Sequence, residues 1–350
     1  MRVLVVGGAG YVGSVLVREL LREEHQVRVL DNLLYGRRGL QEFLGKEPEL
    51  ELIVQDMREV DRSVFDDVDA VVNLGGFSND PIADRFPELN FELNTDAAVR
   101  LAELALECGV RRYVLASTCS VYDSGDDELG DVVKTEDYPV APTAAYSRSK
   151  LEAEKALFAL RDEGLCPIAL RKGTIYGYSP RMRFDLVVNT MVMTALRDGR
   201  ILLHRGGEMW RPLVSVLDVA KAYVLALTAP EDQVSGQVFN IVYCNYRISE
   251  LGLRIAHQLR CMDIQVSVEP DYTPRKVRNY RVSGTRAHRV LGFTPEVSVE
   301  QAVAEMVEKL RAITDLDNPR YYNIRWVELL HELELSGHPE KVFVRGSSVG

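Results

Sequence analysis

Residues 3–13 read VLVVGGAGYVG, an apolar run that passes directly into glycines at positions 7, 10 and 13. The apolar run predicts a short buried strand, and the apolar spacing over residues 12–21 predicts a helix immediately after it. At such a junction Gly7 permits the tight turn, Gly10 lets the backbone approach a pyrophosphate, and Gly13 lets the helix pack closely on the strand. The helix N-terminus adds N–H donors and a positive dipole end. The stretch therefore predicts a dinucleotide-binding βα unit.

The rest of the first half alternates apolar runs with helical patterns. The expected strands cover residues 2–6, 26–30, 50–54, 70–74, 112–116 and 167–170, and the longer helices cover 94–108 and 146–160. This alternation predicts an α/β protein with a Rossmann-type, doubly wound parallel sheet that binds its ligands at the carboxyl ends of the strands. We expect this domain over residues 1–175, with segments near 211–242 returning to it. A smaller, substrate-facing α/β portion over 176–312 and a tail over 313–350 with one helix complete the expected organisation.

Composition narrows the class of protein. The 350 residues carry a formal net charge of -10 at pH 7, which argues against a nucleic-acid or anionic-membrane partner, because both need a basic surface. The five cysteines are widely spaced without a CxxC pair, and the histidines lack metal-ligand spacing, so we expect neither disulfides nor a metal site. No apolar stretch approaches the ~18 residues of a membrane span. We expect a cytoplasmic protein.

Two acidic residues follow expected strands. Asp31 lies 24 residues after Gly7, where a carboxylate accepts hydrogen bonds from both ribose hydroxyls and repels a 2′-phosphate. This position favours NAD(H) over NADP(H), although Arg37 and Arg38 leave room for the opposite preference. Asp56, after the third strand, either hydrogen-bonds the adenine or caps its own loop.

A tyrosine and a lysine one helical turn apart follow far downstream, at positions 146 and 150. Tyrosine has an ordinary pKa of about 10 and is a poor base at neutral pH. Lys150 lies on the same helix face, where its charge can lower the pKa of Tyr146 while its amine binds the nicotinamide ribose. Thr118, after the fifth strand, would share the substrate oxygen with Tyr146. Together with the glycine motif, these residues predict nicotinamide-dependent redox chemistry at a hydroxyl or carbonyl.

Over residues 1–312 these motifs resemble the extended short-chain dehydrogenase/reductase superfamily, in its NAD-dependent nucleotide-sugar epimerase/dehydratase branch. The resemblance extends to QDMRE at 55–59, VVNLGG at 71–76, STCSVY at 117–122, YSRSK at 146–150, LRKGTIYG at 170–177, RPLVSVLDVA at 211–220 and YRVSGTRAHRVLGF at 280–293. It implies a Rossmann domain, a small C-terminal portion that binds a nucleotide-diphospho-sugar, and a homodimer formed by two helices per subunit, here 94–108 and 147–160.

The resemblance also implies roles for individual residues. It makes Thr118, Tyr146 and Lys150 catalytic, and Arg211 the contact to the nucleotide diphosphate, with Arg278 a second candidate. The implied cofactor-binding residues are Gly7, Gly10, Tyr11, Val12, Gly13, Asp31, Asn32, Asp56, Met57, Leu74, Gly75, Gly76, Asn94, Tyr146 and Lys150. The implied substrate-binding residues are Thr118, Cys119, Ser120, Thr174, Arg183, Asn189, Arg211 and Arg278.

One departure from the family pattern bears on the reaction. Sugar 4,6-dehydratases carry Asp-Glu directly after the catalytic Thr, whereas Cys119 and Ser120 stand here, which argues against dehydration. We interpret Cys119 as a semi-buried wall residue.

Arg181 and Arg183 either clamp phosphates or a sugar carboxylate or lie in a solvated loop. We predict a C4 epimerase that works through a transient 4-keto sugar. The main alternative is an NAD(P)H-dependent 4-keto-sugar reductase. Two further hypotheses, which the residues favour less, are a sugar 4,6-dehydratase and a non-catalytic NAD(H)-binding sensor.

Overall fold

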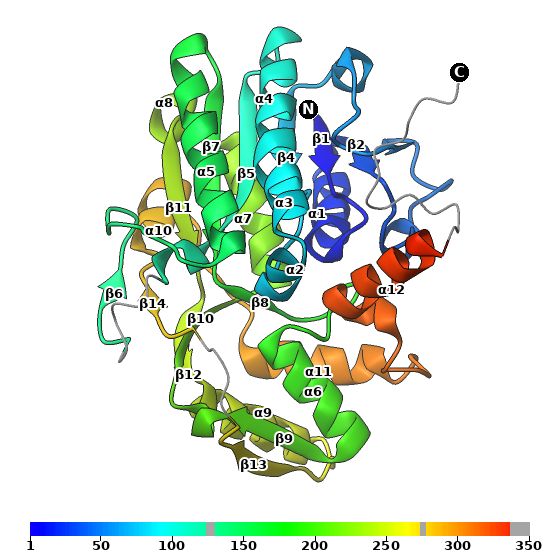
Figure 1. Cartoon of the computed structure of the whole chain (residues 1–350), viewed down its shortest axis with the longest axis vertical. Coiled ribbons are helices and arrows are strands. Elements are labelled where there is room, and N and C mark those ends of the chain that lie inside the picture. The colour runs from blue at the N-terminus through cyan, green and yellow to red at the C-terminus, as the bar shows by residue number, and fades with distance from the viewer. Residues whose placement is uncertain (124–129, 274–277, 337–350) are drawn as a thin grey trace.

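The computed structural model describes residues 1–123, 130–273 and 278–336, which form a larger upper part and a smaller lower part (Figure 1). The larger part is built on a seven-stranded sheet with the order β11-β7-β5-β4-β1-β2-β3, in which every pair is parallel. Its strands are β1 (Arg2–Val6), β2 (Gln26–Asp31), β3 (Leu50–Val54), β4 (Ala70–Asn73), β5 (Arg112–Thr118), β7 (Cys166–Lys172) and β11 (Gln237–Ile241). This is the doubly wound α/β fold that the sequence predicts, and the strand order reverses between β1 and β4.

Helices cover both faces of this sheet because its strands are apolar on both sides. Val3 and Val5 of β1 face α1 (Tyr11–Arg22) and α7 (Val216–Thr228), whereas Leu4 and Val6 face α4 (Ala97–Glu107) and α5 (Ala145–Ala159). Two separate hydrophobic cores result, one on each side of the sheet. The alternation of side chains along a strand explains why one short apolar run supplies both cores.

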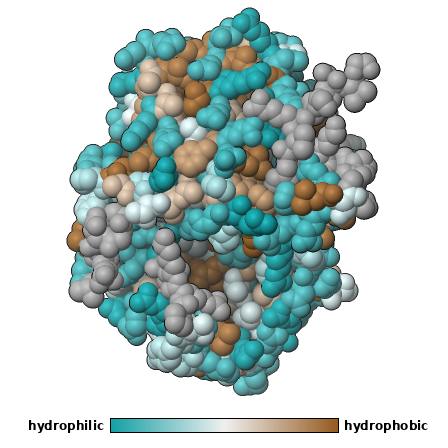
Figure 2. Space-filling view, in the orientation of Figure 1, coloured by the Kyte–Doolittle hydropathy of each residue, from teal (hydrophilic) through white to brown (hydrophobic). Residues whose placement is uncertain are grey.

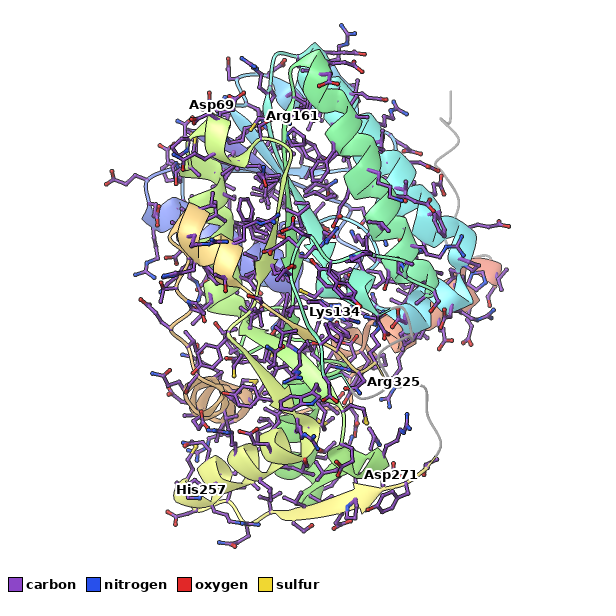
Figure 3. All side chains as sticks on the ribbon, turned by 90° about the vertical axis from the view of Figure 1, so that its left-hand side faces the viewer. Asp69, Lys134, Arg161, His257, Asp271 and Arg325 are labelled. Carbon is purple, nitrogen blue, oxygen red and sulfur yellow. The ribbon has the colours of Figure 1, made fainter. Side chains whose placement is uncertain are left out.

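The smaller part contains two further sheets. β8 (Thr174–Tyr176), β10 (Trp210–Ser215) and β12 (Cys244–Arg247) form one, and β9 (Arg200–His204) and β13 (Ser267–Asp271) form the other. The helices in this region are α6 (Val187–Asp198), α9 (Ile248–Cys261) and α11 (Val299–Leu310). Of the 211–242 stretch, α7 and β11 pack with the large sheet, whereas β10 pairs in the small one. In the side view His257 and Asp271 mark the smaller part, and Asp69 and Arg161 mark the far end of the larger one (Figure 3).

Short elements connect these parts. They are α2 (Asp80–Arg85), α3 (Pro87–Phe91), α8 (Glu231–Val234), α10 (Thr285–Leu291), the paired strands β6 (Val133–Lys134) and β14 (Arg281–Val282), and 3₁₀ helices at Arg38–Leu40, Arg62–Phe65, Cys119–Tyr122, Leu160–Glu163, Arg205–Gly207 and Pro319–Tyr321. The helix expected over 94–108 begins earlier, because α3 runs into α4 through a π-helical turn at Glu92–Asp96. The tail helix α12 (Asn323–Leu335) packs against α2.

The faces of α4 and α5 expected to form a dimer seam are largely used inside the subunit. Leu101, Ala105, Ala153 and Leu157 are buried in the core beneath these helices. These four side chains therefore pack α4 and α5 onto the large sheet. Leu104 and Ala156, the other two residues expected in the seam, are partly exposed. Within the described residues, no helix is long and apolar enough to cross a membrane, and no group of three or more His, Cys, Asp or Glu side chains is arranged to hold a metal ion.

Candidate active site

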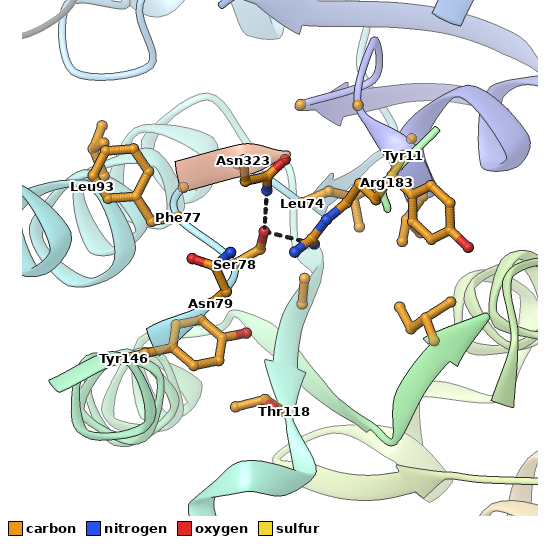
Figure 4. Close-up of a pocket in the computed structure, with 18 of the residues that line it drawn as sticks. Tyr11, Leu74, Phe77, Ser78, Asn79, Leu93, Thr118, Tyr146, Arg183 and Asn323 are labelled. Carbon is orange, nitrogen blue, oxygen red and sulfur yellow. Dashed lines mark hydrogen bonds between the residues drawn. The ribbon is translucent and has the colours of Figure 1, made fainter. Parts of the chain in front are cut away.

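A cavity of about 370 Å³ lies at the carboxyl ends of β1, β4 and β5, where the strand order reverses (Figure 4). Its volume is typical of small-ligand sites, which run from roughly 300 to 1,000 Å³. Its walls come from the loops of the large sheet, from α5, from the segment 173–186 after β7, from residues 278 and 280, and from the start of the tail helix. On the face seen in the space-filling view, the molecule is hollowed between its upper and lower parts, with hydrophobic side chains inside the hollow (Figure 2).

The glycine loop forms one wall and leaves no room for larger residues. Gly7 has a left-handed backbone with φ +76°, and a Cβ on it would lie 3.0 Å from the Gly75 nitrogen. A Cβ on Gly13 would lie 2.2 Å from the Gly7 carbonyl oxygen. Gly10, at the N-cap of α1, carries no side-chain cap, so the first N–H groups of α1 face the cavity side. This arrangement fits the diphosphate of a dinucleotide, because uncapped helix N–H groups bind anions.

Asp31 and Asn32 line the cavity at the end of β2. The Asp31 carboxylate accepts from the backbone nitrogens of Ala9 at 3.0 Å and Leu33 at 2.7 Å. Burial raises the pKa of Asp31, and these two hydrogen bonds oppose that shift. They fix the carboxylate beside the glycine loop, at the position where an adenosine ribose is recognised.

Asp56 lines the cavity but is already engaged. Its carboxylate accepts from the Arg58 guanidinium at 2.7 and 3.0 Å and from the Arg58 backbone nitrogen at 2.9 Å. It therefore caps its own loop. Met57 and Leu74 line the same wall, together with Tyr11, Val12, Gly75 and Gly76. Arg37 and Arg38 are absent from the described cavity lining, and the Arg38 guanidinium donates instead to the Tyr321 hydroxyl at 2.9 Å.

Thr118, Tyr146 and Lys150 all line the cavity, Thr118 from the end of β5 and the other two from α5. Burial raises the pKa of Tyr146, while the positive charge of Arg278 and the Thr118 hydrogen bond lower it. Burial lowers the pKa of Lys150 to about 8, against the opposing effect of Glu154. The charge acting on Tyr146 thus comes chiefly from Arg278, whereas the helix spacing alone pointed to Lys150.

Ser120 lies behind Thr118, away from the cavity. The Ser120 hydroxyl contacts the Thr118 Oγ1 at 2.9 Å, and the Ser120 backbone nitrogen donates to that Oγ1 at 3.1 Å. The Ser147 hydroxyl donates to the Ser120 hydroxyl at 2.8 Å. Ser120 is buried and does not line the cavity. Its hydrogen bonds therefore orient Thr118, and a contact of Ser120 with substrate stays a prediction.

Cys119 also lies away from the cavity. Its thiol is fully buried and donates to the Arg171 carbonyl oxygen at 3.0 Å. Burial raises the pKa of this thiol, so it stays protonated. The chain turns sharply into a 3₁₀ helix after Thr118, which directs this side chain into the core around Val121 and Leu151. The interpretation of Cys119 as a semi-buried wall residue is corrected accordingly.

Three arginines and a threonine were expected on the substrate side. Thr174, Arg183 and Arg278 line the cavity, whereas Arg211 lies behind Tyr280, with its guanidinium 5.9 Å from that ring. Arg211 donates to the Trp210 carbonyl oxygen at 3.0 Å. Arg211 is not among the described residues that line this cavity, and its contact to the nucleotide diphosphate stays a prediction.

Two of the three arginines that line the cavity are tied to carboxylates. Arg183 forms a bidentate pair with Asp185, at 2.7 and 3.0 Å, and Arg278 pairs with Asp80. Arg183 is buried, so the solvated-loop alternative for the segment is wrong.

Asn94 and Asn189 support the cavity from behind. In the π-helical turn, the Asn94 amide donates to Asn90 at 2.9 Å, and its oxygen faces Gly76 without a hydrogen-bond partner among the described residues. Asn189 donates to the Tyr11 hydroxyl at 3.1 Å and to the Arg183 carbonyl oxygen at 2.9 Å. Both were expected to contact a ligand, and neither lines the described cavity. They hold the loops that do.

Lys172, Asp185 and Asn323 are among the cavity residues that were not assigned to the site from the sequence. Lys172 pairs in register with Thr118 across β5 and β7, so strand pairing could have revealed it. Its amine donates to the Tyr223 hydroxyl at 3.0 Å, and burial lowers its pKa well below the usual value. Asn323 carries no local signal, because only the docking of the tail brings it to the cavity.

The comparison with protein families gives one decisive result. The family described as "NAD dependent epimerase/dehydratase family" matches residues 3–242. The chain belongs to this family. The cofactor of the NAD-dependent epimerase/dehydratase family is NAD, and the glycine loop, Asp31 and the uncapped start of α1 fit that dinucleotide.

Individual family members resemble the whole chain. UDP-glucose 4-epimerase from Mycolicibacterium smegmatis is 30% identical over 89% of this chain and 99% of its own length. UDP-glucuronic acid decarboxylase 1 from Xenopus tropicalis is 28% identical over 89% of this chain and 72% of its own. The structure of DesIV, a dTDP-glucose 4,6-dehydratase from Streptomyces venezuelae with NAD and TYD bound, is 26% identical, with a TM-score of 0.76 over 91% of this chain and all of its own. Members this similar are named for three reactions, so membership identifies a nucleotide-sugar enzyme without fixing its reaction.

Proposed function

We propose that this protein is a nucleotide-diphospho-sugar 4-epimerase that works through a transient 4-keto sugar. The observation that carries the proposal is the composition of the catalytic wall. Thr118, Tyr146 and Lys150 line the cavity, whereas the two positions after Thr118 carry Cys119 and Ser120, both buried away from it. A dehydratase needs a carboxylic acid pair there to eliminate water, so the set supports oxidation and reduction at one carbon.

The residues divide the proton chemistry between them. NAD, when bound, supplies a hydride acceptor and returns the hydride. Tyr146 takes the proton from the C4 hydroxyl and gives it back to the opposite epimer, while Thr118, oriented by Ser120, holds the same oxygen. Arg278 favours the tyrosinate because its positive charge lowers the pKa of Tyr146. Lys150 supplies a second cationic donor on the same face of α5.

The test is turnover of a panel of UDP- and dTDP-linked sugars in D₂O, followed by NMR. We expect the C4 epimer, no net change in absorbance at 340 nm, no CO₂ release and no carbon-bound deuterium in the sugar, because the hydride returns directly to C4. Tyr146→Phe should abolish this turnover, and Tyr272→Phe, on an exposed tyrosine, should leave it intact. Stoichiometric consumption of NADH or NADPH would contradict the proposal and establish the 4-keto reductase. Loss of CO₂ or water would assign a decarboxylase or a dehydratase.

We further propose that the protein is a cytoplasmic homodimer. Light scattering coupled to gel filtration measures the assembly, and a mass of twice 39.4 kDa is expected. Fractionation of cells expressing the tagged chain tests the compartment.

A further inference from the structure

We propose that α12 and Arg181 form the outer wall of the NAD site and retain the bound dinucleotide between catalytic cycles. The inference concerns the cofactor, and it holds for an epimerase or for any other reaction at the sugar. It begins at Asn323, the first residue of α12, which lines the cavity although only 3% of its surface is exposed.

Asn323 joins the tail to the loop after β4. Its amide nitrogen donates to the Ser78 hydroxyl at 3.1 Å, and the Arg183 guanidinium donates to the same oxygen at 2.8 Å (Figure 4). Ser78 lies three residues after Gly75, whose backbone nitrogen would be 3.0 Å from a Cβ on Gly7. The tail therefore fixes the loop opposite the N-terminus of α1.

The same helix is anchored to the loop after β2. The Trp326 indole N–H donates to the Leu34 carbonyl oxygen at 2.6 Å, and Val327 is buried against Phe77 and Ile82 with Leu34 and Tyr35 beside them. Since β1 lies between β2 and β4 in the sheet, a helix attached to both of these loops spans the glycine loop that follows β1. In a doubly wound fold that loop holds the cofactor diphosphate. The position of α12 thus closes the groove from the side opposite α1.

Arg181 supplies the positive charge of this wall. It lines the cavity, is 5% exposed, and stacks 3.8 Å from the centre of the Tyr35 ring. One guanidinium nitrogen donates to the Asn323 amide oxygen at 2.5 Å, while its Nε has no hydrogen-bond partner and no carboxylate pairs with it among the described residues. Burial lowers the pKa of Arg181 to about 10. The carboxylates of Asp185 and Asp31 attract this guanidinium without forming a salt bridge with it. A buried guanidinium that no carboxylate pairs with directly is costly, which points to a further anion supplied by a ligand.

The cofactor diphosphate is the anion that best fits this position. Ser179, two residues before Arg181, contacts the first turns of α1, because its hydroxyl donates to the Tyr11 carbonyl oxygen at 2.8 Å and lies 2.9 Å from the Ser14 hydroxyl. The stacking partner Tyr35 belongs to the loop that carries Asp31, at the adenosine end. Arg183 and Arg278, by contrast, already pair with carboxylates. Arg181 is therefore placed to neutralise the phosphates held at the α1 N-terminus.

The test follows exchange of bound NAD in the full-length protein without any sugar. Protein loaded with NAD is mixed with excess deuterated NAD, and mass spectrometry records replacement over time. Arg181→Met and Asn323→Ala should accelerate exchange on the order of tenfold to a hundredfold, the loss expected for hydrogen bonds to a charged group. Trp326→Phe, which removes an anchor outside the cavity, should accelerate it as well. Arg325→Met, an exposed arginine on the same helix, is the matched control and should not.

Two results would overturn the proposal. One is an unchanged rate of NAD exchange in Arg181→Met and Asn323→Ala, with a native circular dichroism spectrum. Arg181→Lys keeps the positive charge and should retain most of the bound NAD, so it distinguishes loss of the charge from a folding defect. The other is a raised KM for the nucleotide sugar with unchanged NAD exchange, which would assign Arg181 to the substrate diphosphate. Because no sugar is present in the exchange assay, failure of the epimerase proposal leaves its outcome unaffected.

Discussion

The pair formed by Arg171 of β7 and Glu154 of α5 gives the sharpest test of how α5, the helix of Tyr146 and Lys150, is held. Their side chains are 5% and 2% exposed, and the guanidinium donates to the carboxylate at 2.6 and 2.9 Å. Arg171 also donates to the Tyr122 hydroxyl at 2.8 Å, and the Ser117 hydroxyl donates to Glu154. Removing one member leaves the other charge buried without its partner, which costs about 3–5 kcal/mol. The change Glu154→Leu should therefore lower the free energy of unfolding by that amount.

The expected shift in melting temperature follows from chain length. Unfolding entropy is about 2.1 cal/mol/K per residue, so 350 residues give about 0.7 kcal/mol/K, and the loss corresponds to a Tm lower by about 4–7 °C. Differential scanning calorimetry of Glu154→Leu, Arg171→Met and the double variant measures it. The double variant should melt above either single one, because two apolar side chains leave no unpaired charge. If instead the double variant loses the sum of the two single losses, the account of an uncompensated buried charge is wrong.

Three further predictions concern the site. Arg278→Gln should raise the pKa of Tyr146, because it removes the positive charge that lowers this pKa. In a plot of kcat against pH, the region in which kcat increases should therefore move to higher pH. An unchanged profile would exclude this role of Arg278. Gly13→Ala should abolish NAD binding or folding, since its Cβ would lie 2.2 Å from the Gly7 carbonyl oxygen. Isothermal titration calorimetry with NAD measures this, and an unchanged affinity would contradict the prediction. Cys119→Ala should retain turnover, and iodoacetamide should fail to label this buried thiol in the native protein, whereas inactivation by labelling at this position would restore a role for it in the site.

The parts of the fold and site that depend on local pattern could be predicted from the sequence. The strand–glycine–helix stretch at 3–13 and the Tyr146–Lys150 pair are each local in sequence. Spacing alone therefore indicates which of their side chains meet. Asp31 could be placed because it ends a strand adjacent to β1. Family membership and the doubly wound sheet follow from these same elements.

What could not be predicted depends on turns and on contacts distant in sequence. The direction of Cys119 is decided by the 3₁₀ turn after β5, which reverses the alternation expected of a strand. The pairing of Arg181 with Asn323 spans 142 residues, and no spacing rule connects them. The charge acting on Tyr146 comes from Arg278, 132 positions further on, because β14 and its flanking loop return beside α5.

The edge strand of the large sheet also bears on how the chain can be divided. β11, residues 237–241, pairs with β7 and forms this edge of the sheet. α7 packs beside α1 on one face of the sheet. Both α7 and β11 come after residue 175, beyond the first substrate-side segments of the chain. A fragment ending near residue 175 would present the backbone of β7 as an open edge and leave the apolar side chains beneath α7 in water. Open apolar edges recruit other chains. The dinucleotide-binding half is therefore expected to aggregate when produced alone, and during synthesis it can complete its sheet only after residue 241 has left the ribosome.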